Sequence, residues 1–235
     1  MPGPDGNAVR TEIADGALPY SAFAGVFNRF AACCLLALVL VGLANVPGGA
    51  AELRILALGD SLTAGYGLPA RDAFPSQLER ALNAAGVPAK LINAGVSGDT
   101  TAGGLARLDW ALDDKPDAVV LCLGANDALR GLDPAAMEVN LDRILGRLRT
   151  RGLPVLLAGM LAPPNMGAEY GRQYNAIFPR LAEKHGALFY PFFLDGVAAV
   201  PALNQADGMH PNADGVAAIV ERILPRVKEL ARRLG

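Results

Sequence analysis

Apolar runs alternate with amphipathic patterns from Leu53 to the end of the chain, and this alternation constrains the fold more than any other feature. Short apolar runs indicate strands at residues 54–58, 89–93, 118–123, 155–159 and 188–190. The patterns between and after them indicate helices at 73–85, 104–112, 134–151, 171–185 and 213–234. Strands that alternate with helices are typical of βαβ units. The sequence therefore predicts an α/β fold with a five-stranded parallel sheet, in one domain spanning residues 52–235.

The composition indicates a globular protein that acts on a small molecule. Of its 235 residues, 52% are hydrophobic and 19% charged, which is a globular rather than a disordered composition. The formal net charge is −2 and no run of Lys and Arg carries interleaved aromatic residues, so we expect no nucleic-acid partner. The sequence contains neither a phosphate-binding loop nor a dinucleotide fingerprint, and its few His and Cys residues do not suggest a metal site. We therefore expect no cofactor, no metal and no stable protein partner.

Ser61 follows the first predicted strand, in the stretch ILALGDSLTAGYG at residues 55–67. A parallel α/β sheet presents its ligands at the carboxyl ends of its strands, so Ser61 is a candidate nucleophile. Alternatively, Asp60 and Ser61 only cap a helix, because both residue types are favoured at that position. A serine nucleophile needs a base to take its proton and donors to hold the oxyanion, and a cap needs neither.

The base is best sought among the two histidines. His185 ends a predicted helix, where we expect it to be exposed and structural. His210 lies in the loop before the last helix, three residues after Asp207. Across a turn, the Asp207 carboxylate can reach the Nδ1–H group of His210 and leave Nε2 free to accept the Ser61 proton. The spacing therefore predicts a catalytic triad.

Two further loops can supply oxyanion donors. Gly98, in GVSGDTT after the second predicted strand, can present its backbone N–H without an obstructing side chain. Asn126, in GAND after the third strand, can donate from its side-chain amide. Together with the N–H group of Ser61, these make three donors at the ends of three consecutive strands.

These four segments resemble the four blocks of the SGNH (GDSL) hydrolase family, in the family's chain order. GDSL surrounds Ser61, GVSGDT contains Gly98, GAND contains Asn126, and DGMHP contains His210. The likeness extends over residues 53–234 and is strongest toward bacterial periplasmic thioesterases, lysophospholipases and arylesterases. The resemblance implies a three-layer α/β/α sandwich of flavodoxin-like type.

The resemblance also implies a serine esterase acting on carboxylic esters or thioesters through an acyl-enzyme. Ser61, Asp207 and His210 would form the triad, and Ser61, Gly98 and Asn126 the oxyanion hole. Residues 160–167 would form a mobile substrate loop over the acyl groove. We expect substrate contacts from Asp60, Met160, Leu161, Ala162 and Pro163.

Two other functions compete with this interpretation. The first is a carbohydrate-ester deacetylase on the same scaffold, but the apolar loop residues Met160, Leu161 and Met166 favour acyl chains over sugars. The second is a binding module without activity, which the presence of every triad residue disfavours. The open choice among esters, thioesters and lysophospholipids leaves contact with membrane lipid possible through the substrate.

Residues 1–51 differ from the rest and are predicted to contain a secretory signal peptide. An apolar block at residues 31–44 follows Arg29 and precedes small residues, with cleavage expected near Ala51. An uncleaved membrane anchor is the alternative, although the block is shorter than the ~20 residues that a spanning helix needs. Cleavage would remove two of the three cysteines, leave Cys122 alone and give a mature formal net charge of −1. We expect a periplasmic or secreted protein.

Overall fold

The computed structural model describes Gly3 and residues 51–234. The apolar block of the predicted signal peptide lies outside these residues. Within them, no helix is both long enough and apolar enough to cross a bilayer.

Five parallel strands form one sheet, as predicted. They are β1 (Leu53–Gly59), β2 (Ala89–Gly95), β3 (Ala118–Cys122), β4 (Val155–Ala158) and β5 (Leu188–Tyr190), in the spatial order β2-β1-β3-β4-β5. In the register of the sheet, Gly59 at the end of β1 lies opposite Gly95 of β2 and Cys122 of β3. The loops that follow these three strands therefore leave the sheet at the same level.

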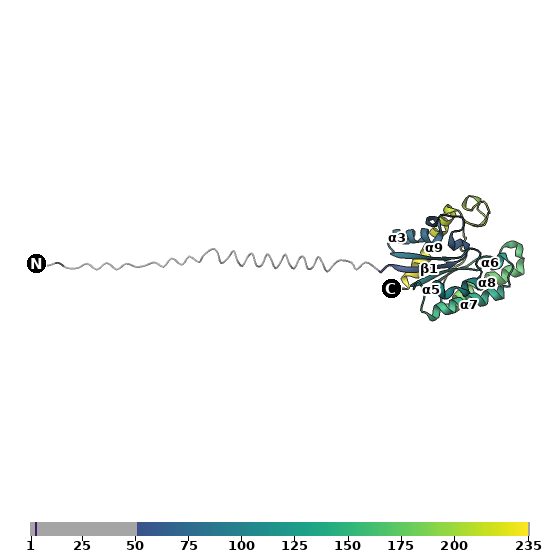
Figure 1. Cartoon of the computed structure of the whole chain (residues 1–235), viewed down its shortest axis with the longest axis horizontal. Coiled ribbons are helices and arrows are strands. Elements are labelled where there is room, and N and C mark those ends of the chain that lie inside the picture. Colours follow the sequence, from purple (N-terminus) through teal and green to yellow (C-terminus); the bar gives the residue numbers. More distant parts are fainter. Residues whose placement is uncertain (1–2, 4–50, 235) are drawn as a thin grey trace. The chain divides into compact units, whose positions relative to one another are not determined.

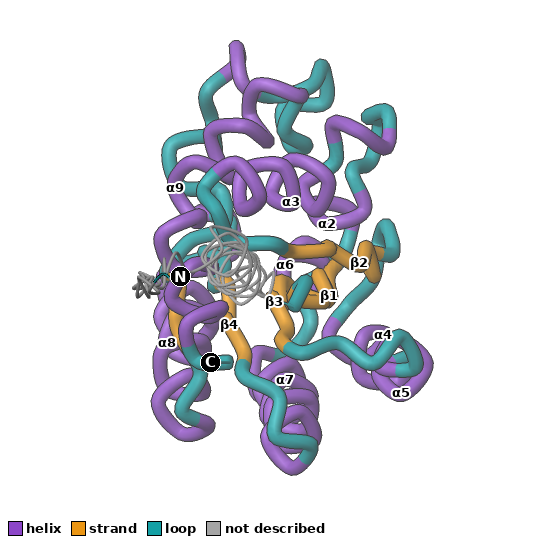
Figure 2. The backbone as a smooth tube through the Cα atoms, turned by 90° about the vertical axis from the view of Figure 1, so that its left-hand side faces the viewer, coloured by secondary structure: helices purple, strands orange, loops and turns teal. Residues whose placement is uncertain are grey.

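Helices cover both faces of the sheet, which confirms the three-layer α/β/α architecture (Figure 1, Figure 2). One face carries α3 (Phe74–Ala84) and α9 (Ala213–Arg232). The other carries α4 (Thr101–Ala106), α5 (Leu108–Leu112), α7 (Pro134–Thr150) and α8 (Ala168–His185). Because both faces are covered, β3 and β4 are buried along their whole length, and their sequences are continuously apolar.

The remaining elements are short and were not predicted. They are α2 (Ser61–Ala64), α6 (Ala125–Leu129) and the 3₁₀ helices η1 (Ala70–Asp72), η2 (Pro164–Met166) and η3 (Pro201–Leu203). The prediction of a single helix over residues 104–112 was wrong, because α4 and α5 are separated at Arg107. The side chain of Arg107 turns back to donate to Gly59 O and Asp99, so this residue serves the strand ends rather than a continuous helix.

Truncating a side chain in the middle of the sheet should destabilise the protein strongly. Leu121 of β3 is fully buried, so Leu121→Ala removes apolar contacts and leaves a cavity. We expect the free energy of unfolding to fall by about 2–5 kcal/mol, measured by urea denaturation. Val139→Ala on the exposed side of α7 is the control and should change it by less than about 1 kcal/mol. Equal effects of the two substitutions would contradict this account of the core.

Candidate active site

Ser61 is the first residue of α2, directly beyond the end of β1. Asp60 caps this short helix, with its Oδ1 accepting a hydrogen bond from Leu62 N at 3.0 Å. The helix packs tightly on the neighbouring strand: a Cβ atom on Gly95 would lie 2.2 Å from Ala64 N. The two interpretations of this segment are therefore compatible: Asp60 caps the helix, and Ser61 lines a cleft.

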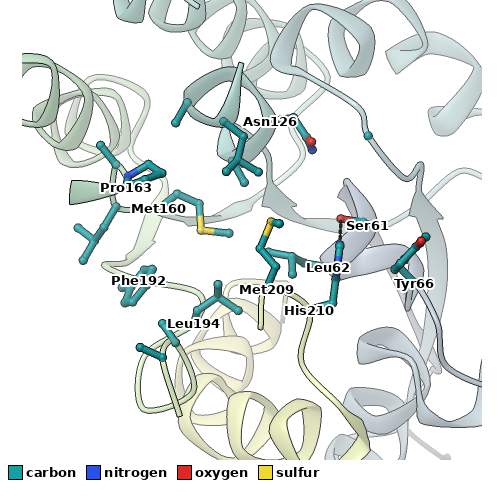
Figure 3. Close-up of a pocket in the computed structure, with 18 of the residues that line it drawn as sticks. Ser61, Leu62, Tyr66, Asn126, Met160, Pro163, Phe192, Leu194, Met209 and His210 are labelled. Atoms are coloured by element: carbon teal, nitrogen blue, oxygen red, sulfur yellow. Dashed lines mark hydrogen bonds between the residues drawn. The ribbon is translucent and has the colours of Figure 1, made fainter. Parts of the chain in front are cut away.

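His210 and Asp207 lie on one turn and form the hydrogen bonds that their spacing predicts. His210 Nε2 is 3.0 Å from Ser61 Oγ (Figure 3), and His210 Nδ1 is 2.6 Å from Asp207 Oδ2. Asp207 Oδ1 also accepts from the backbone N–H groups of His210 and Met209, at 3.0 and 2.9 Å. Hydrogen bonds from the backbone and side chain of His210, then from Met209 N–H, lower the pKa of Asp207 from 3.8 to about 2. Asp207 is therefore ionised at neutral pH and can stabilise a protonated imidazole.

Backbone and amide hydrogen bonds hold this turn in place. Asn204 and Pro211 form an isolated antiparallel bridge, and Gln205 N donates to His210 O at 2.7 Å. The side-chain amide of Gln205 donates to Pro211 O at 2.9 Å and to Tyr66 O at 2.8 Å. Gln205 therefore ties the histidine turn to the segment that follows the serine helix.

The two predicted oxyanion residues, Gly98 and Asn126, both line the cleft together with Ser61. Gly98 has a φ of +80°, a backbone conformation that favours glycine. A Cβ there would meet only Arg130 Nη2, at 3.5 Å, so within the chain it is the positive φ rather than crowding that selects glycine. Asn126 Nδ2 donates to Asp99 O at 2.9 Å and, more weakly, to Asp60 Oδ2 at 3.3 Å.

Asp127, the residue after Asn126, anchors α6 to the start of α4. Asp127 is buried, and its carboxylate accepts from Thr101 N at 2.9 Å and from Thr101 Oγ1 at 2.6 Å. Burial raises the pKa of Asp127, and the two hydrogen bonds from Thr101 oppose that effect. These bonds join the start of α4 to α6 and so position the amide of Asn126.

Asp60 does not occupy the place expected of a substrate contact. Its relative exposure is 0% and it does not line the cleft, so the prediction of direct substrate contact was wrong. Burial raises the pKa of this carboxyl from 3.8 to about 6, despite the hydrogen bond from Leu62 N. Asp60 lies beneath the site, where it supports both the serine helix and Asn126.

Arg107 is a largely buried cation that connects the same loops. Its Nε donates to Asp99 Oδ2 at 2.7 Å and its Nη2 donates to Gly59 O at 2.9 Å. Asp99 in turn accepts from Asn126 through its backbone carbonyl. The guanidinium thus links the end of β1 to the loop after β2. No role for Arg107 could be predicted from the sequence, because an isolated Arg in a helical pattern carries no functional signal.

The cleft beside Ser61 has a volume of about 690 Å³ and is lined mainly by apolar side chains. Met160, Leu161, Ala162 and Pro163 line it, and their contact with substrate stays a prediction. Met166 does not line it, so this residue does not support the preference for acyl chains. The mobility of residues 160–167 stays a prediction.

Several cleft residues had no predicted role, among them Tyr66, Phe192, Leu194 and Met209. In Figure 3, Met160, Phe192 and Leu194 gather on one side of the Ser61–His210 pair and Tyr66 lies on the other. Met209 and Tyr66 are about half exposed, at 51% and 52%. Met209 had a signal in the sequence, because it directly precedes the candidate base His210, whereas Tyr66 had only its place in the stretch 55–67, five residues after Ser61.

His185 is remote from this site, as expected, but it is not exposed. Its side chain is only 5% accessible, and Nε2 lies 2.6 Å from Asp142 Oδ1 on α7. The contact with α7 explains the burial, which the helix-end pattern did not reveal. Among residues 51–234, no three His, Cys, Asp or Glu side chains are grouped so as to hold a metal ion.

The chain is similar in sequence to one family of lipases and acylhydrolases and to individual esterases. The model of the GDSL-like lipase/acylhydrolase family matches residues 57–218. Esterase TesA of Pseudomonas aeruginosa is 38% identical over 182 residues, covering 77% of this chain and 90% of that protein. An arylesterase of Vibrio mimicus is 39% identical over 201 residues, covering 85% of this chain and 98% of that protein.

The fold comparison agrees with the sequence matches. The crystal structure of AlinE4, described as an SGNH-hydrolase family esterase, superposes with a TM-score of 0.65 at 50% identity. The match covers 76% of this chain and 96% of AlinE4.

Replacing Asp60 should change how stability depends on pH. Between about pH 4 and pH 6 Asp60 ionises in the unfolded chain but keeps its proton in the folded protein. The folded protein therefore binds more protons, and this group makes the free energy of unfolding fall as the pH rises through that range. Asp60→Asn removes the contribution, which amounts to about 3 kcal/mol for a shift of about two pKa units.

The measurement is urea denaturation of the wild type and Asp60→Asn at pH 4 and pH 7. We expect the stability of the variant relative to the wild type to rise by about 2 kcal/mol between the two pH values, because at pH 4 the unfolded chain has already lost part of its proton. Asp113→Asn at an exposed position is the matched control, for which this difference should stay near zero. A difference for Asp60→Asn that is independent of pH would contradict the assignment of Asp60 as a buried titrating group.

Proposed function

Since the chain belongs to the GDSL-like lipase/acylhydrolase family, we propose that it hydrolyses carboxylic esters or thioesters with apolar acyl groups through an acyl-enzyme on Ser61. The observation that carries this proposal is the hydrogen-bonded series Ser61–His210–Asp207 at the wall of an apolar cleft. Relatives described as an esterase and an arylesterase support the reaction class.

Acylation begins at the hydrogen bond between Ser61 and His210. Nε2 accepts the Ser61 proton at 3.0 Å as Oγ attacks the carbonyl carbon, and a tetrahedral intermediate forms. The ionised carboxylate of Asp207 fixes the imidazole by its Nδ1 and stabilises the positive charge that develops on the ring. His210 then gives the proton to the leaving oxygen or sulfur, the bond to the acyl carbon breaks, and the alcohol or thiol departs.

Three donors receive the negative charge of the intermediate. They are the N–H groups of Ser61 and Gly98 and the side-chain amide of Asn126, all of which line the cleft. Asn126 holds two acceptors in the free protein, and its 3.3 Å bond to Asp60 is the weaker. The oxyanion would compete for that N–H group, while the 2.9 Å bond to Asp99 O keeps the amide oriented.

Deacylation repeats the sequence with water as the nucleophile. His210 takes a proton from water, the hydroxide attacks the acyl carbon, and collapse of the second intermediate returns the proton to Ser61 Oγ. The free acid leaves and the resting hydrogen bonds are restored.

Removing the Asn126 amide should cripple turnover without unfolding the protein. We expect Asn126→Ala to lower kcat on p-nitrophenyl esters by about 10²–10³, the usual effect of losing one oxyanion donor. Because the change also removes a hydrogen bond to Asp60, thermal unfolding should be recorded to show that the variant is folded. Near-full turnover in the folded variant would rule out the role given to Asn126.

The lining of the cleft favours apolar acyl groups over acylated sugars. We expect kcat/KM to be higher for octanoyl and aryl esters than for acetylated xylan, measured on the protein with residues 1–51 removed. Fluorophosphonate labelling of wild type and Ser61→Ala is the control, and only the wild type should be labelled. Higher activity on acetyl-xylan would favour a carbohydrate-ester deacetylase, and absence of labelling would favour a binding module.

A further inference from the structure

Tyr66 is the cleft residue in ring contact with His210. The centroids of the two rings are 4.6 Å apart and their planes are inclined by 37°. The Tyr66 side chain remains 52% exposed and lines the cleft, so part of the ring is open to a ligand. None of the proposed catalytic steps uses this residue.

The backbone on both sides of this ring pair is fixed. Gln205 Nε2 donates to Tyr66 O at 2.8 Å and the backbone N–H of Gln205 donates to His210 O at 2.7 Å, so this one residue holds the residues carrying both rings. Tyr66 N also donates to Ser61 O at 3.1 Å. The aromatic surface is therefore positioned relative to both the nucleophile and the base before any ligand binds.

The chemistry at His210 determines which part of a substrate meets Tyr66. His210 Nε2 must come within hydrogen-bonding distance of the leaving oxygen or sulfur in order to protonate it. The first atoms of the alcohol or thiol portion therefore lie beside the imidazole, next to Tyr66. The larger apolar part of the cleft, with Met160, Phe192 and Leu194, lies on the opposite side of Ser61 and is left for the acyl chain (Figure 3).

We propose that Tyr66 forms a leaving-group subsite that selects substrates with an aromatic ring in the alcohol or thiol portion. This inference rests on the proposed function, because it needs His210 to act as the acid toward the leaving group. An aromatic ring gains edge-to-face or offset stacking energy on Tyr66 that a saturated ring of the same size does not. Such a contact corresponds to a preference of about 2- to 10-fold in kcat/KM.

The test compares benzyl acetate with cyclohexylmethyl acetate. Both are acetates of primary alcohols and carry a six-membered ring at the same position, so they differ mainly in aromaticity. We define the ring ratio as kcat/KM for benzyl acetate divided by kcat/KM for cyclohexylmethyl acetate. This ratio should fall about 2- to 10-fold in Tyr66→Leu and stay near the wild-type value in Tyr66→Phe. Phe192→Leu is the matched control: it makes a similar change on the acyl side, and should alter the preference between octanoyl and acetyl esters but not the ring ratio.

Three results would overturn the proposal. An unchanged ring ratio in Tyr66→Leu would show that Tyr66 does not contact the leaving group. If kcat/KM fell equally for both esters in Tyr66→Leu and its pH profile were displaced, Tyr66 would only position His210. Failure of a fluorophosphonate to label Ser61 in the wild type would overturn the proposed function and the subsite together, whereas normal labelling with either of the first two results would overturn the subsite alone.

Discussion

Parallel pairing of β1 with both β2 and β3 is the constraint on which the site depends. Because the three strands end in register, the segments carrying Ser61, Gly98 and Asn126 emerge beside one another. In the order β2-β1-β3-β4-β5, the chain adds β2 on one side of β1 and β3 on the other. The crevice at such a switch point is where α/β sheets bind their ligands. A slip of one residue in either pairing would separate Ser61, the proposed nucleophile, from the proposed donors Gly98 and Asn126.

Polar groups buried beneath the strand ends hold this arrangement together. Arg107 joins Gly59 O to Asp99, Asn126 joins Asp99 O to Asp60, and Asp60 caps the serine helix. Burying a carboxyl and a guanidinium is costly unless each is hydrogen-bonded. Nε and Nη2 of Arg107 are bonded, whereas its Nη1 is buried and has no partner among the described residues. The network therefore joins the end of β1 to the loops that follow β2 and β3.

Much of the fold and of the site could be predicted from the sequence, because the governing signals are local. Apolar runs located the strands, although β2 is interrupted by Lys90 and Asn93, and the three-residue spacing of Asp207 and His210 predicted their hydrogen bond. Asp60 was misassigned because a residue beside the nucleophile can face the cleft or the interior, and the sequence does not distinguish the two. Tyr66, Phe192 and Leu194 were missed because apolar side chains in loops resemble core residues until the tertiary structure brings them to one cleft.

The position of Asp207 and His210 on one turn has a consequence for how the protein loses activity. Within the series Ser61–His210–Asp207, the contact with Ser61 Oγ joins distant parts of the chain, whereas the carboxylate–imidazole pair is local. Residues 204–211 are held by an isolated bridge and a few hydrogen bonds, whereas β3 and β4 are buried in the core. Such a segment can open without the sheet unfolding. Mild heat or denaturant should therefore open this turn before the sheet unfolds, moving His210 and Asp207 away from Ser61 together. Activity would be lost while the core stays folded, and it would return when the turn closes under mild conditions.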